Sequence, residues 1–119
     1  MNIKVQIFKN IVIVMLFTSC SEKNSILAVD PKDVDVVEIY DNDNLKDMIL
    51  KIDRSSEIEQ LFRLINKGKT EVIKFRPKYR MIIIDSTNTE IILFNDKLIK
   101  YKSKSYRLNN SLYDKLNLN

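Results

Sequence analysis

Two short stretches in the carboxyl-terminal half are apolar at every position, and they restrict the possible folds more than any other feature. Residues 81–84 read Met-Ile-Ile-Ile, and residues 91–94 read Ile-Ile-Leu-Phe. A strand with one wet face alternates apolar and polar residues, whereas a strand that is apolar throughout needs both faces shielded from water. Either helices on opposite faces or strong curling of the sheet would provide that shield. The alternative is that a partner protein covers one face.

The segments around these stretches predict an α+β domain with a mainly antiparallel sheet of five to six strands. Clusters of turn-forming residues separate short segments rich in β-branched residues. Strands are therefore expected at residues 34–40, 48–52, 71–75, 79–85, 89–94 and 98–108, the last broken near residues 103–105. Within residues 48–52, period-two alternation predicts that Met48, Leu50 and Ile52 share one face.

One three-turn helix is predicted between the second and third of these strands. Ser56 and Glu59 form a capping-box pattern in which Ser56 caps the helix and Glu59 reaches back to its amide. Apolar residues then follow at helical spacing, namely Ile58, Leu61, Phe62 and Ile65. Gly68 stands where a left-handed helix terminus is expected.

A second, short helix is predicted at the carboxyl terminus. Either Asn110 or Ser111 can cap it. Its apolar residues are Leu112, Tyr113 and Leu116. The expected element order is therefore ββα followed by ββββα.

The first twenty residues have the composition of an export signal. Lys4 and Lys9 precede seven apolar residues at 11–17, and small residues stand directly before Cys20. The apolar run is too short to span the roughly 30 Å of hydrocarbon in a bilayer. Residues 16–20, Leu-Phe-Thr-Ser-Cys, resemble the lipobox of bacterial lipoproteins, although Phe17 occupies a position where that family usually has an aliphatic residue.

The resemblance implies that the chain is cleaved before Cys20 and that this cysteine is acylated. Residues 1–19 would be the signal peptide, residues 20–33 the lipidated cysteine and a polar tether, and residues 34–119 a single α+β domain. Two or three acyl chains would hold the domain at the outer face of a bacterial membrane, either the outer membrane or the outer leaflet of the cytoplasmic membrane. An ordinary cleaved secretory signal and a buried amino-terminal strand are the alternatives.

The residue types that this chain lacks exclude most catalytic chemistry. It has no histidine, and its single cysteine is Cys20, which lipidation would consume. No serine lies in a nucleophile elbow, and no pattern predicts a metal site or a cofactor. Residues 41–44, Asp-Asn-Asp-Asn, favour a hairpin turn over a calcium loop, because the glycine and glutamate of such a loop are missing. We therefore expect no enzyme, and one that uses carboxylates alone is the remote alternative.

Charge is divided unequally along the chain. Residues 22–59 contain 11 acidic and 5 basic residues, whereas residues 60–119 contain 5 acidic and 13 basic ones. Aromatic residues lie between many of the basic ones. The candidate surface for an anion or a partner comprises Lys74, Arg76, Lys78, Arg80, Lys100, Lys102, Lys104 and Arg107. These side chains could equally be the solvated faces and turns of antiparallel strands.

Three functional hypotheses follow. The first is a binding or adaptor module that docks an envelope protein, with the membrane as a second partner through the amino-terminal lipid. The second is a binder of anionic envelope polymers or lipid headgroups, whose recognition would use the basic and aromatic surface. The third is the carboxylate enzyme. Export to the envelope argues against nucleic acid as a ligand.

Overall fold

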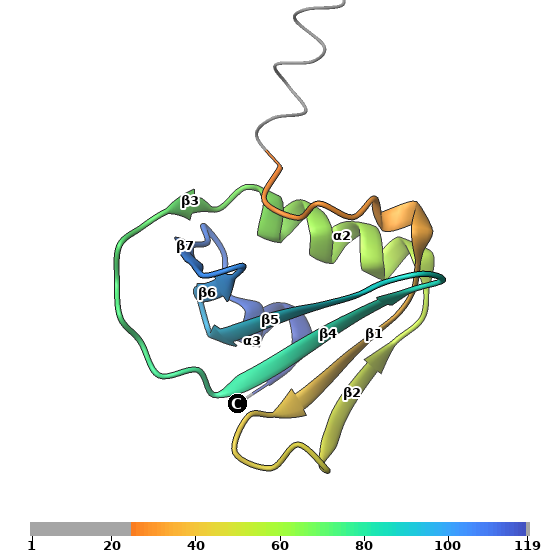
Figure 1. The fold of residues 1–119 in the computed structure, drawn as a ribbon, viewed down its shortest axis with the longest axis horizontal. Helices are drawn as coiled ribbons and strands as arrows, with labels where there is room; N and C mark the ends of the chain where they lie inside the picture. The colour runs from red at the N-terminus through yellow and green to blue at the C-terminus, as the bar shows by residue number, and fades with distance from the viewer. Residues whose placement is uncertain (1–24, 119) are drawn as a thin grey trace, which may run out of the picture.

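The computed structural model describes residues 25–118, which form one antiparallel sheet and two α-helices (Figure 1). The predicted signal peptide and the predicted lipidation of Cys20 lie outside the described residues. The elements are η1 (Pro31–Asp33), β1 (Val34–Asp41), β2 (Met48–Ile52), α2 (Ser55–Asn66), β3 (Lys69–Thr70), β4 (Tyr79–Asp85), β5 (Thr89–Asn95), β6 (Leu98–Tyr101), β7 (Lys104–Arg107) and α3 (Leu112–Leu116).

The sheet has seven strands in the order β2-β1-β4-β5-β6-β7-β3, and all neighbouring pairs are antiparallel. The predicted α+β class and antiparallel sheet are confirmed, but the predicted count of five to six strands is too low. Residues 98–108 form two strands because Lys102 and Ser103 take positive φ values of 50° and 67° and make a tight hairpin turn between them.

The third predicted strand, residues 71–75, is wrong. Only Lys69–Thr70 pairs with β7, and one further hydrogen bond, from Glu71 N to Ser105 O, extends this edge. The chain then runs as a wide arch to the start of β4 (Figure 1). Pro77 near the end of this arch has no amide hydrogen to give to a sheet. We call residues 71–78 the strap.

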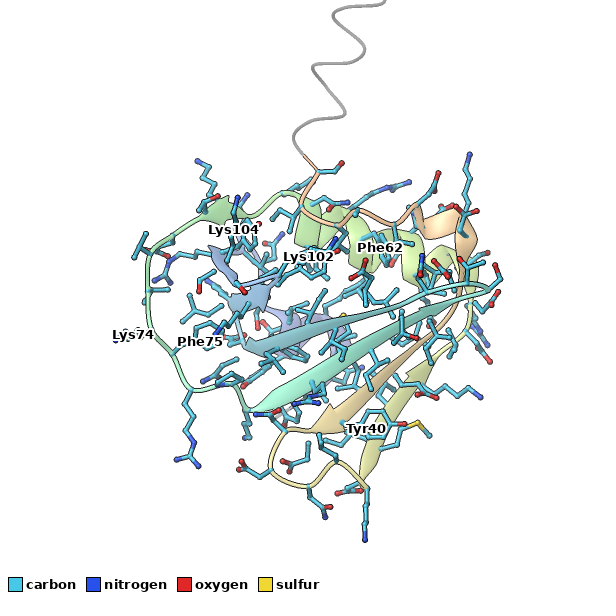
Figure 2. The ribbon with its side chains drawn as sticks, in the orientation of Figure 1. Tyr40, Phe62, Lys74, Phe75, Lys102 and Lys104 are labelled. Atoms are coloured by element: carbon cyan, nitrogen blue, oxygen red, sulfur yellow. The ribbon has the colours of Figure 1, made fainter. Side chains whose placement is uncertain are left out.

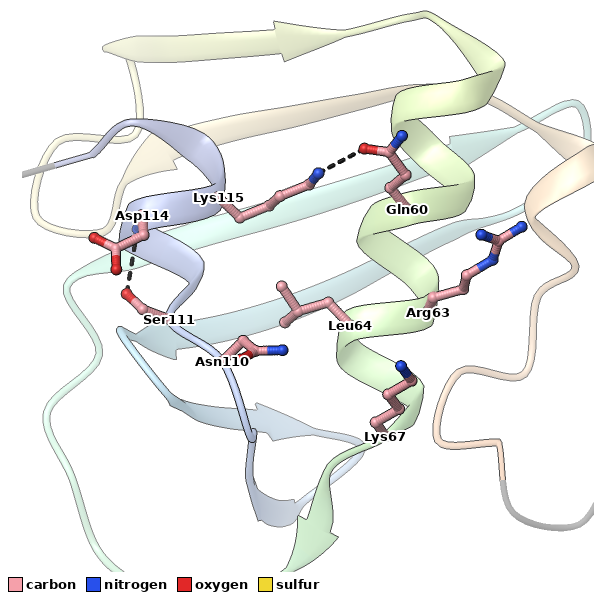
Figure 3. Close-up of a pocket in the computed structure, with 8 residues that line it drawn as sticks. All are labelled: Gln60, Arg63, Leu64, Lys67, Asn110, Ser111, Asp114 and Lys115. Carbon is pink, nitrogen blue, oxygen red and sulfur yellow. Dashed lines mark hydrogen bonds between the residues drawn. The ribbon is translucent and has the colours of Figure 1, made fainter.

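Both α-helices cover the same face of the sheet, which we call the inner face. The close-up in Figure 3 views the sheet through α2 and α3, which both lie in front of it. The inner face supplies the core from alternate strand positions, including Val37, Ile39, Met81, Ile83 and Ile92. The buried face of α2 consists of the four residues that sequence periodicity predicted, Ile58, Leu61, Phe62 and Ile65.

The carboxyl-terminal helix α3 closes the other part of the inner face. Ser111 caps it, as one of the two predicted alternatives, and its side-chain oxygen accepts a hydrogen bond from Asp114 N at 3.2 Å. Tyr113 of α3 packs edge-on against Tyr79 of β4, with ring centroids 5.5 Å apart. Contacts of this kind are favourable beyond the area that they bury, and they fix α3 against the central strands.

The predicted capping box at Ser56 is wrong. Helix α2 begins at Ser55, so Ser56 already lies inside its first turn, and the N-cap residue Arg54 makes no side-chain capping bond. The first turn closes instead through a backbone bond from Ile58 N to Arg54 O at 3.0 Å. The buried position of Ile58 sets where the helix starts, and tertiary burial outweighs the local capping signal.

Gly68 follows α2 but does not take a left-handed conformation, since no glycine in the described residues has a positive φ. Its role is a close approach. A Cβ at this position would lie 2.8 Å from Leu108 Cδ2 and 3.1 Å from Ile26 Cδ1. Gly68 therefore lets the chain after α2 pass between two apolar side chains.

The described part of the segment that we predicted as a tether packs on the domain. We call residues 25–30 the arm. Leu27 is buried, and the side-chain oxygen of Asn66 accepts hydrogen bonds from the backbone amides of Ile26 and Leu27 at 3.1 and 2.9 Å. The apolar run Ile26 to Val29 inside this polar segment was the signal for such packing.

Candidate functional site

The face of the sheet opposite the helices, which we call the outer face, is rich in exposed and half-buried apolar side chains. The strand register assigns residues to this face, because cross-strand partners point to the same side. Val36 lies opposite Ile84, Ile82 lies opposite Ile91, and Arg80 lies opposite Leu93. The outer-face residues of the central strands are Val36, Glu38, Tyr40, Arg80, Ile82, Ile84, Thr89, Ile91, Leu93, Asn95, Leu98 and Lys100, and Lys51 of the edge strand β2 lies opposite Glu38 on the same face.

No helix of the described residues covers this face, so the expectation of helices on opposite faces is wrong. Ile91 is 47% exposed, and its strand neighbours Ile82, Ile84 and Leu93 are only half-buried. None of these four belongs to the hydrophobic core. These side chains are neighbours across the strands, as Ile82 and Ile91 are, and so shield one another in part from water. Such a surface is unusual on a solitary domain, since contiguous apolar patches commonly mark interaction sites.

A β-bulge extends the apolar surface to the edge strand β2. The register shifts between Ile39 and Tyr40, so Met48 pairs with Tyr40 although Leu50 pairs with Ile39. The extra residue turns Met48 to the outer face, where it is 46% exposed, and the prediction that it shares a face with Leu50 and Ile52 is wrong. Leu45 and Ile49 beside it are exposed as well.

Polar and charged side chains lie among the apolar ones on the outer face. Tyr40 donates a hydrogen bond to Glu38 Oε1 at 3.0 Å, and this bond is the main reason that the pKa of Tyr40 lies above its ordinary value. Arg80 is half-buried between Tyr40 and Leu93, and its Nε is buried without a hydrogen-bond partner in the described residues. A buried donor without an acceptor is unfavourable, so an acceptor from a covering molecule would improve this site.

The structure distributes the eight predicted basic residues over two regions. In the strap, Lys74, Arg76 and Lys78 are exposed and alternate with half-buried Ile73, Phe75 and Pro77. Figure 2 shows Lys74 on the strap, away from Lys102 and Lys104 of the β6–β7 hairpin. A cleft of about 320 Å³ lies between strap and hairpin, and Lys74 and Lys104 both line it.

The other basic residues lie on the sheet or its turns. Lys100 is exposed on the outer face opposite Leu93. Lys102 lies 3.7 Å from Glu90 Oε1, and the pKa of Lys102 is raised, first by Tyr101 and then by Glu90. Arg107 Nε bonds Glu71 Oε2 at 2.5 Å. The candidates therefore do not form one site, and two of them already have anionic partners.

A groove lies between the two helices, on the inner side of the molecule (Figure 3). It has a volume of about 520 Å³, and its polar lining includes Arg63, Lys67, Asp114 and Lys115. Lys115 Nζ donates to Gln60 Oε1 at 2.6 Å and so links the two helices across it. The groove is open, and the polar groups point along its rim rather than converge on one point, so its geometry indicates no reaction.

The described residues contain no cluster of three or more His, Cys, Asp or Glu side chains that could hold a metal ion, and none of their polar or charged residues is buried. The lowered pKa of Asp85 has a structural cause, since its carboxylate accepts backbone hydrogen bonds from Asn88 and Thr87 in the β4–β5 turn. Asp41 likewise accepts a bond from Asp43 N at 2.8 Å, so residues 41–44 form the predicted hairpin turn.

Comparison with known proteins identifies no related protein. The chain matches no family model, and it matches neither a curated protein nor a solved structure. Within residues 25–118, no helix is both long and apolar enough to cross a membrane.

The sequence predicted the candidate surface only in part. The unbroken apolar runs predicted that Ile82, Ile84 and Ile91 need shielding, and Arg80 was among the predicted basic residues. That Arg80 and Met48 share one face with these apolar residues was not predicted. The adjacent apolar pair Met48-Ile49 was a weak sign of a bulge, because strict alternation does not produce it.

Proposed function

We propose that this protein is a non-catalytic binding module, held at the outer face of a bacterial membrane by acylation of Cys20, which docks a protein through the outer face of its sheet. The uncovered apolar surface around Ile82, Ile84, Ile91 and Leu93 carries this proposal. It lies opposite a core that is already closed by two helices, so the fold of the described residues does not require it to be apolar. When the fold does not require a surface to be apolar, the apolar residues there are best explained by binding to another molecule.

The polar groups on the same surface fit protein docking. Arg80 offers an Nε donor that has no acceptor in the described residues, and Tyr40 presents an amphipathic ring at the margin of the apolar area. Arginine and tyrosine are enriched at the centres of protein interfaces, where they combine apolar contact with directed hydrogen bonds.

The anchor and the docking surface require separate tests. Changing Cys20 to Ala should move the protein from the membrane fraction to the soluble fraction, and the mass of the mature wild-type amino terminus should include acyl chains. Changing Cys20 to Ser should release the protein equally. A wild-type product that retains residues 1–19, or that carries an unmodified thiol, would remove the anchor from the proposal.

For docking, the wild-type chain and an Ile82→Lys, Ile91→Lys variant should be isolated from solubilised envelopes. We expect the wild type to retain a stoichiometric protein on its outer face and the variant to lose it. Ser56→Lys, an exposed change on α2, is the matched control and should retain it. Equal recovery with all three chains would contradict docking through this face.

A second candidate, binding of anionic polymers or lipid headgroups, is favoured by one observation. The strap presents Lys74, Arg76 and Lys78 outward at every second position, so the three charges lie at intervals of about 7 Å along an extended chain. Binding to vesicles containing about one third anionic lipid should weaken as salt rises from about 50 to about 500 mM, because exposed charges are screened. Replacing all three residues with Gln should abolish the binding, and salt-independent binding would contradict this candidate.

A further inference from the structure

We infer that the carboxyl-terminal end of α2 contacts the anionic headgroups of the membrane that holds the lipid anchor. The contact residues are Arg63, Lys67 and Lys69, which we call the basic end. This inference rests on the proposed acylation of Cys20, and it concerns a surface separate from both the outer face and the strap. Two features support it: the place where the arm joins the domain, and the distribution of charge along α2.

The arm brings the anchor to the basic end. Asn66 at the end of α2 accepts the amide hydrogens of Ile26 and Leu27, and Ile26 packs beside Gly68. Figure 1 shows that the described chain begins here, on the side of the molecule opposite the β1–β2 hairpin. Only five peptide units join Cys20 to residue 25. Because such a segment spans at most about 18 Å, acyl chains on Cys20 would keep the basic end close to the bilayer surface.

Charge is polarised along α2, and the end beside the arm is the basic one. Residues 53–59 contain three acidic residues and one basic residue, whereas residues 63–69 contain three basic residues and no acidic one. The helix η1, with Asp33 and its N-cap residue Asp30, packs on α2 near the acidic end (Figure 1). An anionic bilayer attracts one end of α2 and repels the other, so it favours the orientation that the arm already permits.

The groups around the basic end do not cancel its charge. Within residues 25–118, Arg63, Lys67 and Lys69 are exposed and form no ion pair. Three further bases lie nearby, and each is accompanied by an acid: Arg107 by Glu71, Lys97 by Asp96 and Lys115 by Asp114. These pairs add no net charge. The net charge of this end is therefore that of its three unpaired bases.

The helix alone explains only part of this pattern. Acidic residues in the first turn of a helix and basic residues in the last turn are favourable, because they complement the helix dipole. Lys69, however, lies beyond the helix in β3, where the dipole no longer acts, and it is exposed. The basic surface therefore extends past the residues that the dipole favours, and contact with headgroups accounts for this extension.

Membrane contact at the basic end is compatible with protein docking. Helix α2 covers the inner face of the sheet, whereas the apolar side chains around Ile82 and Ile91 lie on the outer face. A bilayer that contacts the end of α2 therefore leaves the outer face accessible. The two surfaces can be occupied at the same time, and they can be tested independently.

The test is a proximity measurement on the full lipidated chain in vesicles. Because lipidation consumes Cys20, a single new thiol can carry a fluorophore, either at Thr70→Cys beside the basic end or at Leu45→Cys in the β1–β2 hairpin, both exposed. Nitroxide groups on the lipid headgroups quench a fluorophore that approaches the bilayer. Raising anionic lipid from zero to about one third should increase quenching several-fold at residue 70 and leave residue 45 unchanged.

Removal of charge tests the three bases directly. Replacing Arg63, Lys67 and Lys69 with Gln should lower the ratio of docked to free domains about a hundredfold, because each base near an anionic surface contributes about fivefold. Salt at about 500 mM should likewise abolish the quenching of the unsubstituted chain, since it screens exposed charges. The matched control, Lys32→Gln, Lys46→Gln, Lys51→Gln, removes the same net charge elsewhere on the surface and should retain the quenching.

Three results would overturn the inference. Equal quenching at residue 70 in neutral and anionic vesicles, by a chain that stays in the membrane fraction, would remove the contact and keep the anchor. Loss of quenching when Lys74, Arg76 and Lys78 are replaced, but not when the basic end is, would assign the headgroups to the strap instead. A free thiol on Cys20 of the mature chain would overturn the anchor and this inference together.

Discussion

The two faces of the sheet contain similar residues but have different surroundings. Ile82 and Ile83 are adjacent on β4, yet Ile83 is buried under the helices while Ile82 is half-buried on the face that no described helix covers. The apolar side chains of the inner face are buried by other parts of the same chain. The apolar side chains of the outer face are buried only in part, so each contributes less to folding than a fully buried neighbour. An apolar residue type alone therefore does not reveal which purpose a position serves.

The largest expected effect compares these two neighbours directly. Ile83→Ala should lower the free energy of unfolding by about 3 to 4 kcal/mol, because it leaves a cavity in the core. Ile82→Ala should lower it by only about 1 to 2 kcal/mol, because this side chain is half-buried. Urea denaturation of dilute protein measures both. Equal losses would mean that the outer face is covered by the chain itself.

Gly68→Ala tests how tightly the inner layer is packed. An added Cβ would lie 2.8 Å from Leu108 Cδ2, so we expect a loss of about 2 kcal/mol in the free energy of unfolding. Shortening the neighbour in Gly68→Ala, Leu108→Ala should make the two losses non-additive. Replacing Gly by Ala stabilises a protein where the added Cβ meets no neighbour. If Gly68→Ala stabilises this protein, Leu108 does not pack as closely against Gly68 as described.

Asn66→Ala tests the arm on the helix layer. Loss of the side-chain oxygen that accepts from Ile26 N and Leu27 N should lower the free energy of unfolding by about 1 to 1.5 kcal/mol. Hydrogen exchange at these two amides should accelerate. Asn66→Asp keeps the acceptor and should retain most of the protection. Unchanged exchange in Asn66→Ala would contradict the role of these two hydrogen bonds, which we call the clamp.

The smallest effect concerns the β4–β5 turn, outside both faces. Hydrogen bonds from Asn88 and Thr87 lower the pKa of Asp85 below its ordinary 3.8, so the carboxylate stabilises the fold above that pH. This contribution is lost as pH falls through the lowered pKa of the folded state. The stability difference between wild type and Asp85→Ala should therefore narrow in acid. A carboxyl titration by NMR with a midpoint above 3.8 would contradict it.

Much of the fold could be predicted because local patterns carry it. The four core residues of α2 follow from their spacing, and the strand ends follow from turn residues such as Asn44 and Asn88. The strap could not be predicted, because residues 71–78 alternate exposed and half-buried positions as a strand would, yet most of the segment has no neighbouring strand to pair with. Pairing depends on where distant segments lie, which no local pattern records.

From the sequence we could predict that both faces of the central strands need shielding from water, but not which face would form the candidate surface. The apolar runs at residues 81–84 and 91–94 indicated that both faces avoid water, but they could not say that α2 and α3 lie on one side. The side on which a helix packs depends on its connections. The position of Met48 depends on a one-residue bulge, which alternation alone would assign to the opposite face.

The clamp at Asn66 also determines how the domain responds to tension. Residues 26 and 27 are fastened to the end of α2 before the chain enters η1 and the first strand. A pull from the amino-terminal side therefore reaches α2 and its packing first, while the hydrogen bonds of β1 are loaded only after the clamp has opened. A force applied at residue 25 therefore reaches the sheet, and with it the outer face, only after these two hydrogen bonds have broken.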